Sequence, residues 1–178
     1  FLTATGCLGL YSYITQVLSG SVNSPDLAFS LWSVGGLIGC TVIGYIVDRT
    51  GKPQIVMMVI LAVLFLMITV IPILRSVPIV GLLPFFVWGA MGWASVTPQQ
   101  YSLMKIKSGH DAIFVALNSS AVNFGTVIGT ALGGWALMSG LAAVYLPYVT
   151  SAFVFCAFVC QILLIQTDSR NSPVSDNA

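Results

Sequence analysis

The chain has 178 residues, of which 57% are hydrophobic and only 6% are charged, and its formal net charge is +1. An average soluble domain is about 25% charged, so this composition excludes a soluble globular protein and indicates a membrane protein. A nucleic-acid-binding surface needs clustered Lys and Arg on one face, and so few charges exclude it. The expected surroundings are therefore a lipid bilayer, and no nucleic-acid partner is expected.

Six apolar runs follow one another along the sequence, and each is close to the roughly 20 residues that a helix needs to cross a membrane. Helices are favoured because membrane strands are about half as long and alternate in polarity. The predicted spans are residues 1–18, 27–47, 53–74, 77–97, 112–138 and 141–166. We therefore expect an all-α bundle of six transmembrane helices over residues 1–166, followed by a disordered polar tail over residues 167–178.

The few basic residues indicate the orientation in the membrane. The loops after the second and fourth spans, together with the tail, carry five Lys and Arg, whereas Arg75 alone lies on the opposite side. Lys and Arg concentrate in cytoplasmic loops, so both ends of this segment are expected in the cytoplasm, in a multi-pass protein of the plasma or inner membrane. The sequence opens inside an apolar run without an initiator Met, which we interpret as a fragment.

Glycine is unevenly distributed among the spans. Spans two and five hold four glycines each, whereas spans three and six hold none. Small residues let helix backbones approach closely, so spans two and five are predicted to pack inside the bundle. The predicted packing stripe in span five consists of Gly125, Gly129 and Gly133. Spans three and six are predicted to face lipid.

Spans two and five also share the tetrapeptide Thr-Val-Ile-Gly, at residues 41–44 and 126–129, three helices apart. Copies separated by an odd number of helices run in opposite directions through the membrane. That is the pattern of a three-plus-three inverted repeat. The tetrapeptide is short, so it favours such a repeat without establishing it.

The turn between spans two and three resembles the signature loop of the major facilitator superfamily. The residues that carry the resemblance are Gly44, Asp48, Arg49, Gly51 and Lys52. The superfamily has a second basic residue where this chain has Pro53. The run 118–134 also resembles the penultimate helix of the drug/proton antiporter and sugar-efflux branch. The resemblance implies the C-terminal six-helix half of a twelve-helix transporter, with the N-terminal half of the same chain as its partner.

The same resemblance implies that this loop is a conformational latch on the cytoplasmic side. Gly51 permits a tight turn with positive φ, and Asp48 at the membrane surface is placed to face the positive N-terminal end of a neighbouring helix. The neighbouring helix that Asp48 would face begins near residue 112, and its start already has a cap in Asp111. Asp48 therefore has an alternative partner in Arg49 or in the lysines of the 98–111 loop. The structural alternative is that these charges only fix the topology.

Candidate solute-contacting residues lie on polar stripes at helical spacing, because polar side chains in a membrane helix should face protein or water. Span one has such a stripe, from Thr5 through Ser12 to Gln16, and the resemblance implies that the first and fourth helices line a cavity. Trp88 in span four is a candidate wall for an apolar or aromatic solute, or a packing residue. The candidate cavity residues are Tyr13, Gln16, Trp88, Ser95, Asn123 and Thr126.

No Asp, Glu, Lys, Arg or His lies in the centre of any predicted span, so the spans offer no proton carrier, metal cluster or catalytic group. We predict that the chain is not an enzyme and binds no cofactor or metal. The favoured function is secondary active transport of a small-molecule solute by alternating access, in particular proton-coupled efflux of a drug-like or neutral compound, as in multidrug resistance. The alternatives are a sugar or nutrient permease and a membrane receptor or scaffold that transports nothing.

Overall fold

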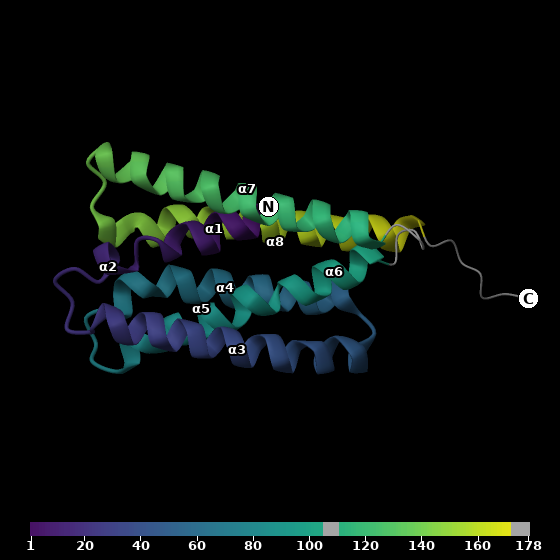
Figure 1. Cartoon of the computed structure of the whole chain (residues 1–178), viewed down its shortest axis with the longest axis horizontal. Helices are drawn as coiled ribbons and strands as arrows, with labels where there is room; N and C mark the ends of the chain where they lie inside the picture. Colours follow the sequence, from purple (N-terminus) through teal and green to yellow (C-terminus); the bar gives the residue numbers. More distant parts are fainter. Residues whose placement is uncertain (105–110, 172–178) are drawn as a thin grey trace, which may run out of the picture.

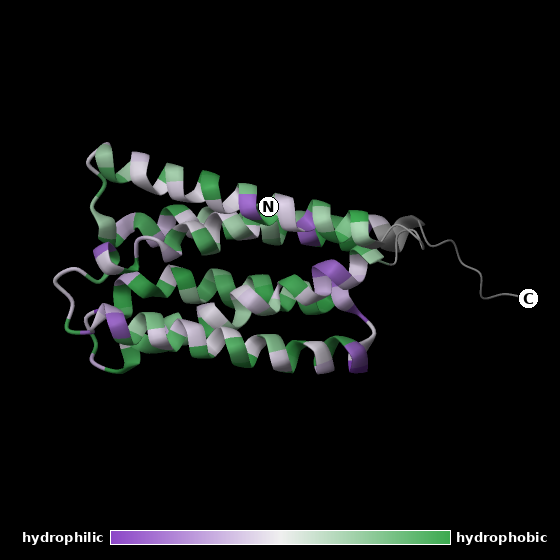
Figure 2. Cartoon of the chain, viewed as in Figure 1, coloured by the Kyte–Doolittle hydropathy of each residue, from purple (hydrophilic) through white to green (hydrophobic). Residues whose placement is uncertain are grey.

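The computed structural model describes residues 1–104 and 111–171, which form a bundle of long helices lying side by side (Figure 1). Within these residues all regular structure is helical. Five of the described helices are long and apolar enough to cross a membrane, and Leu2–Tyr11 adds a shorter apolar helix. Figure 2 shows hydrophobic residues along most of each helix and hydrophilic residues mainly near helix ends. The predicted all-α membrane fold is therefore confirmed.

The helices follow the chain back and forth along the bundle. In order they are α1 (Leu2–Tyr11), α2 (Ile14–Val17), α3 (Pro25–Thr50), α4 (Pro53–Leu74), η1 (Val80–Leu82), α5 (Leu83–Ala94), α6 (Val96–Met104), α7 (Asp111–Met138), η2 (Ala143–Tyr145) and α8 (Leu146–Asn171). The short α2 continues the course of α1, and α6 continues that of α5 (Figure 1).

The connection between α3 and α4 illustrates how local sequence sets the helix ends. Gly51 adopts the left-handed conformation with φ +61°, and its N–H donates to the Val47 carbonyl at 2.9 Å. A glycine in this conformation is a common helix terminator because it carries no Cβ to clash. Pro53 then begins α4, where its missing N–H costs no helical hydrogen bond. The two helices are therefore joined by a very short turn.

Most helix ends differ from the predicted spans by one to three residues, and three differences are larger or interrupt a span. Span one is interrupted at Ser12 and Tyr13, between α1 and α2. The fourth span does not end at residue 97 but continues as α6 to Met104. Residues 167–171, predicted as tail, form the last turns of α8. Polar residues can continue a helix beyond the end of its apolar run, so hydropathy ends the fourth and sixth spans too early. Residues 172–178, the rest of the predicted tail, lie outside the described residues.

The helix pairing repeats itself within the bundle. α1 packs along α7, α3 along α5, and α4 along α8, while α1 also contacts α8 and α5 also contacts α4. If α1 is exchanged with α5, α3 with α7 and α4 with α8, each of these helix contacts maps onto another one in the same set. α1 and α5 run in opposite directions (Figure 1). The pairing is therefore that of a three-plus-three inverted repeat.

Glycines allow the two closest helix pairs to form. On α7, a Cβ added at Gly125 or Gly129 would collide with the backbone carbonyl of Phe1 or Thr5 on α1. The α3–α5 pair has the same arrangement. Two glycines on α3, four residues apart, lie on two backbone carbonyls of α5 that are also four residues apart. Its glycines are Gly35 and Gly39, and its carbonyls belong to Phe86 and Ala90.

These contacts place the repeat in a different register from the shared tetrapeptide. If the two repeats are aligned by their packing contacts, Gly39 corresponds to Gly129, because each lies on a carbonyl of the partner helix. If they are aligned by the shared tetrapeptide, Gly44 corresponds to Gly129. A Cβ added at Gly44 would meet nothing within 4 Å, so Gly44 makes no such contact. The tetrapeptide match is therefore not a packing equivalence.

The glycine-free α4 is partly a core helix, so its prediction as a lipid-facing span is wrong for one face. Leu64, Ile68 and Ile71 have no exposed surface, whereas Val59 and Leu66 on the other face are about half exposed. The apolar side chains of α4 pack against α5 and α8 in contacts that require no glycine. Glycine content alone therefore did not identify them.

A polar cluster ties two loops together at the end of the bundle opposite Asp48. Asn23 is buried, and its Nδ2 donates to the carbonyls of Arg75 and Val77, both at 2.9 Å. Its Oδ1 accepts from the Ile79 N–H at 3.3 Å. Ile79 has φ +63° and ψ −56°, and the Val80 N–H donates across it to the Pro78 carbonyl at 2.6 Å. This is a strained γ-turn, and Asn23 holds it in place.

Replacing Asn23 with Ala is expected to lower the stability of the bundle by about 1–3 kcal/mol, because it leaves buried backbone groups without partners. Thermal unfolding in detergent would measure the loss. Ser33, whose hydroxyl donates only to the Phe29 carbonyl of its own helix, is the control, and Ser33→Ala should leave the melting temperature unchanged. Equal effects of the two substitutions would contradict the role assigned to Asn23.

Candidate functional site

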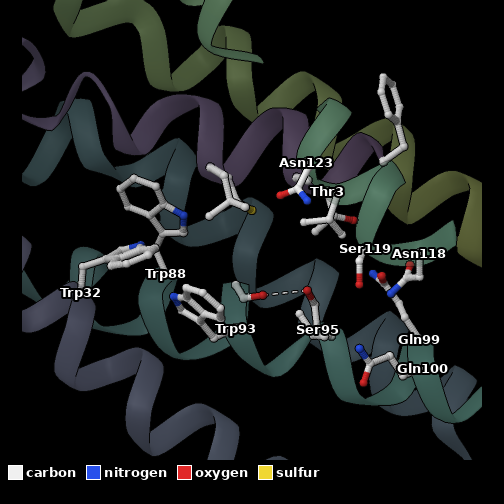
Figure 3. Close-up of a pocket in the computed structure, with 17 residues that line it drawn as sticks. Thr3, Trp32, Trp88, Trp93, Ser95, Gln99, Gln100, Asn118, Ser119 and Asn123 are labelled. Atoms are coloured by element: carbon white, nitrogen blue, oxygen red, sulfur yellow. Dashed lines mark hydrogen bonds between the residues drawn. The ribbon is translucent and has the colours of Figure 1, made fainter. Parts of the chain in front are cut away.

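A cavity of about 370 Å³ lies among α1, α3, α5, α6 and α7. Small-molecule sites in proteins typically measure about 300–1,000 Å³, so the cavity is large enough for a small solute. Figure 3 shows that its two ends differ. Three tryptophans gather at one end, and amide and hydroxyl side chains gather at the other.

The aromatic end is built by α3 and α5. Trp32 lies edge-to-face with both Trp88 and Trp93, with ring centroids 6.1 and 6.0 Å apart. Trp93 lies against Gly36, where an added Cβ would stand 2.6 Å from the indole Cδ1. Tyr11 of α1 extends the cluster, 4.3 Å from Trp32 between centroids. The four rings contact one another, so this side of the cavity is expected to keep its shape without a bound ligand.

The indole N–H groups of Trp32 and Trp88 are buried, and neither has a hydrogen-bond partner within residues 1–104 and 111–171. Buried Trp N–H groups usually have a partner, so two unsatisfied donors beside one cavity are unusual.

The polar end is built by α6 and α7. Its side chains are those of Gln99, Gln100, Asn118, Ser119 and Asn123 (Figure 3). The amide of Gln99 contacts only the weak acceptor Sδ of Met57, at 3.9 Å. In the described part of the chain, the other four make no hydrogen bond. Ser95, by contrast, donates to the Gly92 carbonyl of its own helix at 2.7 Å. The cavity therefore has unused hydrogen-bonding groups at this end.

Among the described residues, none of the side chains lining the cavity belongs to Asp, Glu, Lys, Arg or His. The described residues also contain no group of three His, Cys, Asp or Glu that could hold a metal ion. The groups that these residues offer in the cavity are aromatic rings and neutral hydrogen-bonding side chains.

Three of the six candidate cavity residues line this cavity, namely Trp88, Ser95 and Asn123. The other three lie elsewhere. The Tyr13 hydroxyl donates to the Thr130 carbonyl at 2.5 Å, and Thr126 donates to the Val122 carbonyl of its own helix at 3.0 Å. Gln16 is exposed and outside the cavity.

The polar stripe of span one faces α7 instead of the cavity. Gly9 lies against Gly129, and the Ser12 hydroxyl is 3.5 Å from that of Thr130. Gly133, the third residue of the predicted packing stripe, lies under the ring of Tyr13. The stripe is therefore a helix-packing surface, and α1 presents Thr3, Ala4, Cys7 and Leu8 to the cavity.

The six candidates left out most of the polar and aromatic side chains at the cavity, among them Thr3, Trp32, Trp93 and Gln100. Trp32 lies in a span that was predicted for packing, and its position at the cavity depends on how α3 is rotated against α5. At about 100° per residue, Trp93 and Gln100 lie roughly 120–140° around the helix from Trp88. A stripe drawn through Trp88 at helical spacing therefore does not include them.

The signature-like loop lies at the end of α3. Asp48 is exposed and forms no ion pair within the described residues. Arg49 instead donates to the Tyr45 hydroxyl at 2.6 Å and lies 5.9 Å from the centre of that ring. Lys52 precedes the first residue of α4. Lys105 and Lys107, the other alternative partners of Asp48, lie outside the described residues.

These long apolar helices, which carry the cavity between them, define a multi-pass helical membrane protein. The chain is similar to the inner membrane transport protein YdhP of Escherichia coli strain K12 and of Escherichia coli O157:H7, with 27% identity over 176 residues in each case. The match covers 97% of this chain but 44% of each relative, so the chain spans less than half their length. No family model and no solved structure matches. The similarity supports a membrane transport protein.

Proposed function

We propose that the chain is the C-terminal six-helix half of a secondary transporter of the major facilitator superfamily, which exports a small, drug-like or neutral solute by alternating access. The observation that carries the proposal is the cavity, which draws its walls from both repeats of the bundle. α1 and α3 come from the first repeat, and α5, α6 and α7 come from the second. In transporters built from inverted repeats, the solute site typically lies at the interface between the repeats.

The similarity to an inner membrane transport protein supports this proposal, as does the resemblance of the loop from Gly44 to Lys52 to the superfamily signature. In the proposed orientation this loop faces the cytoplasm, because Arg49 and Lys52 lie on the side richer in basic residues. The polar end of the cavity is formed by the end of α5–α6 that lies toward the same side (Figure 1).

Proton coupling is part of the proposal, and its carrier is expected outside this cavity, because the described residues that line it include no acidic or His side chain. An N-terminal half of the same protein is the proposed location. A carrier there would couple to this cavity through movement of the two halves, without direct contact between proton and solute.

The test is solute flux in proteoliposomes that contain the full-length protein. An imposed proton gradient is expected to drive accumulation of a radiolabelled neutral aryl amide, and a protonophore should abolish it. Protein-free liposomes correct for passive entry. Binding of the amide without any flux would exclude a transporter and favour the receptor or scaffold alternative.

A sugar or nutrient permease is the second candidate function, and one observation favours it. The side-chain amides of Gln99, Gln100, Asn118 and Asn123 line a single cavity, and such amides pair readily with hydroxyl groups. Flux of labelled glucose that exceeds flux of the aryl amide, in the same vesicles, would establish this candidate over the first.

A further inference from the structure

We propose that the cavity selects an uncharged amphipathic solute and holds it in one orientation. An aromatic or apolar body would lie against Trp32, Trp88 and Trp93, and a hydrogen-bonding end would lie among the amides of α6 and α7. Only the description of this ligand as a transported solute rests on the proposed function, because binding can be measured without transport.

The tryptophan end determines where the apolar body lies. Trp88 has no exposed surface and Trp32 is only 7% exposed, yet both line the cavity and both have unsatisfied indole N–H groups. The accessible indole of this wall is Trp93, which is 44% exposed and against which a planar ring can pack. Trp32 supports it through edge-to-face contacts with both Trp93 and Trp88.

The amide end determines where the polar groups lie. The side chains of Gln100, Asn118 and Asn123 make no hydrogen bond in the described part of the chain. Each side-chain amide offers both donors and an acceptor, so these residues recognise carbonyl, hydroxyl or amide groups without needing a charge. Because the two ends offer different chemistry, an amphipathic solute has one favoured orientation.

The lining formed by the described residues disfavours ionic ligands. An ion that leaves water would lose hydration without meeting an opposite charge on any of these side chains, which is unfavourable. A sugar is also a poorer fit than an amphiphile, because Ala4, Cys7 and Leu8 form an apolar wall that leaves hydroxyl groups on one side of the sugar unpaired. The observations therefore favour a neutral aryl amide or a compound of similar chemistry.

The test is binding to the full-length protein in nanodiscs, with probes of similar shape and different charge. The probes are N-benzylbenzamide, which is neutral, dibenzylammonium, which is cationic, diphenylacetate, which is anionic, and glucose. Quenching of tryptophan fluorescence reports binding, after subtraction of the signal from protein-free nanodiscs. We expect the amide to bind at least about tenfold more tightly than each other probe. Trp135, 69% exposed and outside the cavity, supplies the control Trp135→Phe, which should retain the response.

A charge placed at the polar end provides the second measurement. Asn123→Asp changes the shape little and adds a negative charge, so the ratio of affinities should shift at least about tenfold toward dibenzylammonium. If the Asn123→Asp protein does not accumulate in the membrane, Asn118→Asp places the same charge at the polar end and replaces it in this measurement. Gln16→Glu adds the same charge to a residue outside the cavity and should leave the ratio unchanged.

Tight binding of either charged probe to the wild type, equal shifts in Asn123→Asp and Gln16→Glu, or tighter binding of glucose than of the amide would each overturn the inference. Failure of the proposed function is distinguishable from these results. Selective binding of the amide without flux would support the inferred ligand and contradict the proposed transport function. Flux of an ionic solute would support transport and contradict the inferred ligand.

Discussion

Replacing Gly129 with Ala is expected to destabilise the bundle by about 1–3 kcal/mol, because the added methyl group overlaps the Thr5 carbonyl and forces α1 away from α7. Backbone atoms on both sides of this contact cannot move aside as a flexible side chain would. The effect should appear as a lower melting temperature in detergent, measured by the loss of monodisperse protein after heating.

Gly44→Ala is the matched control, because both glycines end the same tetrapeptide and both lie in long helices. A Cβ at Gly44 meets nothing within 4 Å, so this variant should melt at the wild-type temperature or slightly above it. A Gly44→Ala variant as unstable as Gly129→Ala would show that the tetrapeptide, and not the carbonyl contact, marks the equivalent positions.

Asp48→Asn is expected to reduce the initial rate of solute flux by about tenfold or more while leaving membrane insertion intact. Asp48 is exposed and has no ion pair in the described residues, so it adds little to the stability of this conformation. A latch would use its charge in another conformation, against the positive end of a helix. Such a contact is worth up to about 2 kcal/mol, which is enough for a change of that size.

Asp26→Asn provides the control for Asp48→Asn. Asp26 is also exposed, and it lies in the first turn of α3, whereas Asp48 lies near the end of the same helix. Its substitution should leave flux within about twofold of the wild type, since a first-turn carboxylate is worth only about 0.3–1 kcal/mol to the helix. Equal losses in both variants, or unchanged flux in Asp48→Asn, would remove the latch role from this loop.

Much of the fold could be predicted from the sequence, because hydropathy and glycine content respond to strong physical constraints. A helix must bury its backbone groups in lipid, so the long apolar runs could only be helices. Gly125 and Gly129 lie where small residues are needed, against the backbone of α1. Helix ends were harder to predict, because polar residues such as those at 167–171 extend a helix without extending its apolar run.

The cavity was harder to predict, because residue type does not reveal which side of a helix faces which neighbour. The stripe from Thr5 to Gln16 had the composition of a cavity wall, yet its residues pack on α7 or are exposed. Trp32 had no distinguishing pattern in the sequence, because its place beside Trp88 depends on the rotation that Gly35 and Gly39 allow between α3 and α5.

The glycine contacts also have a consequence for motion. They fasten α1 to α7 and α3 to α5, and the cavity lies between these two fastened pairs. A motion that separates these two pairs would widen the cavity and leave every one of these glycine contacts in place. Trp32, Trp88 and Trp93, all carried by α3 and α5, would keep their mutual arrangement in such a motion.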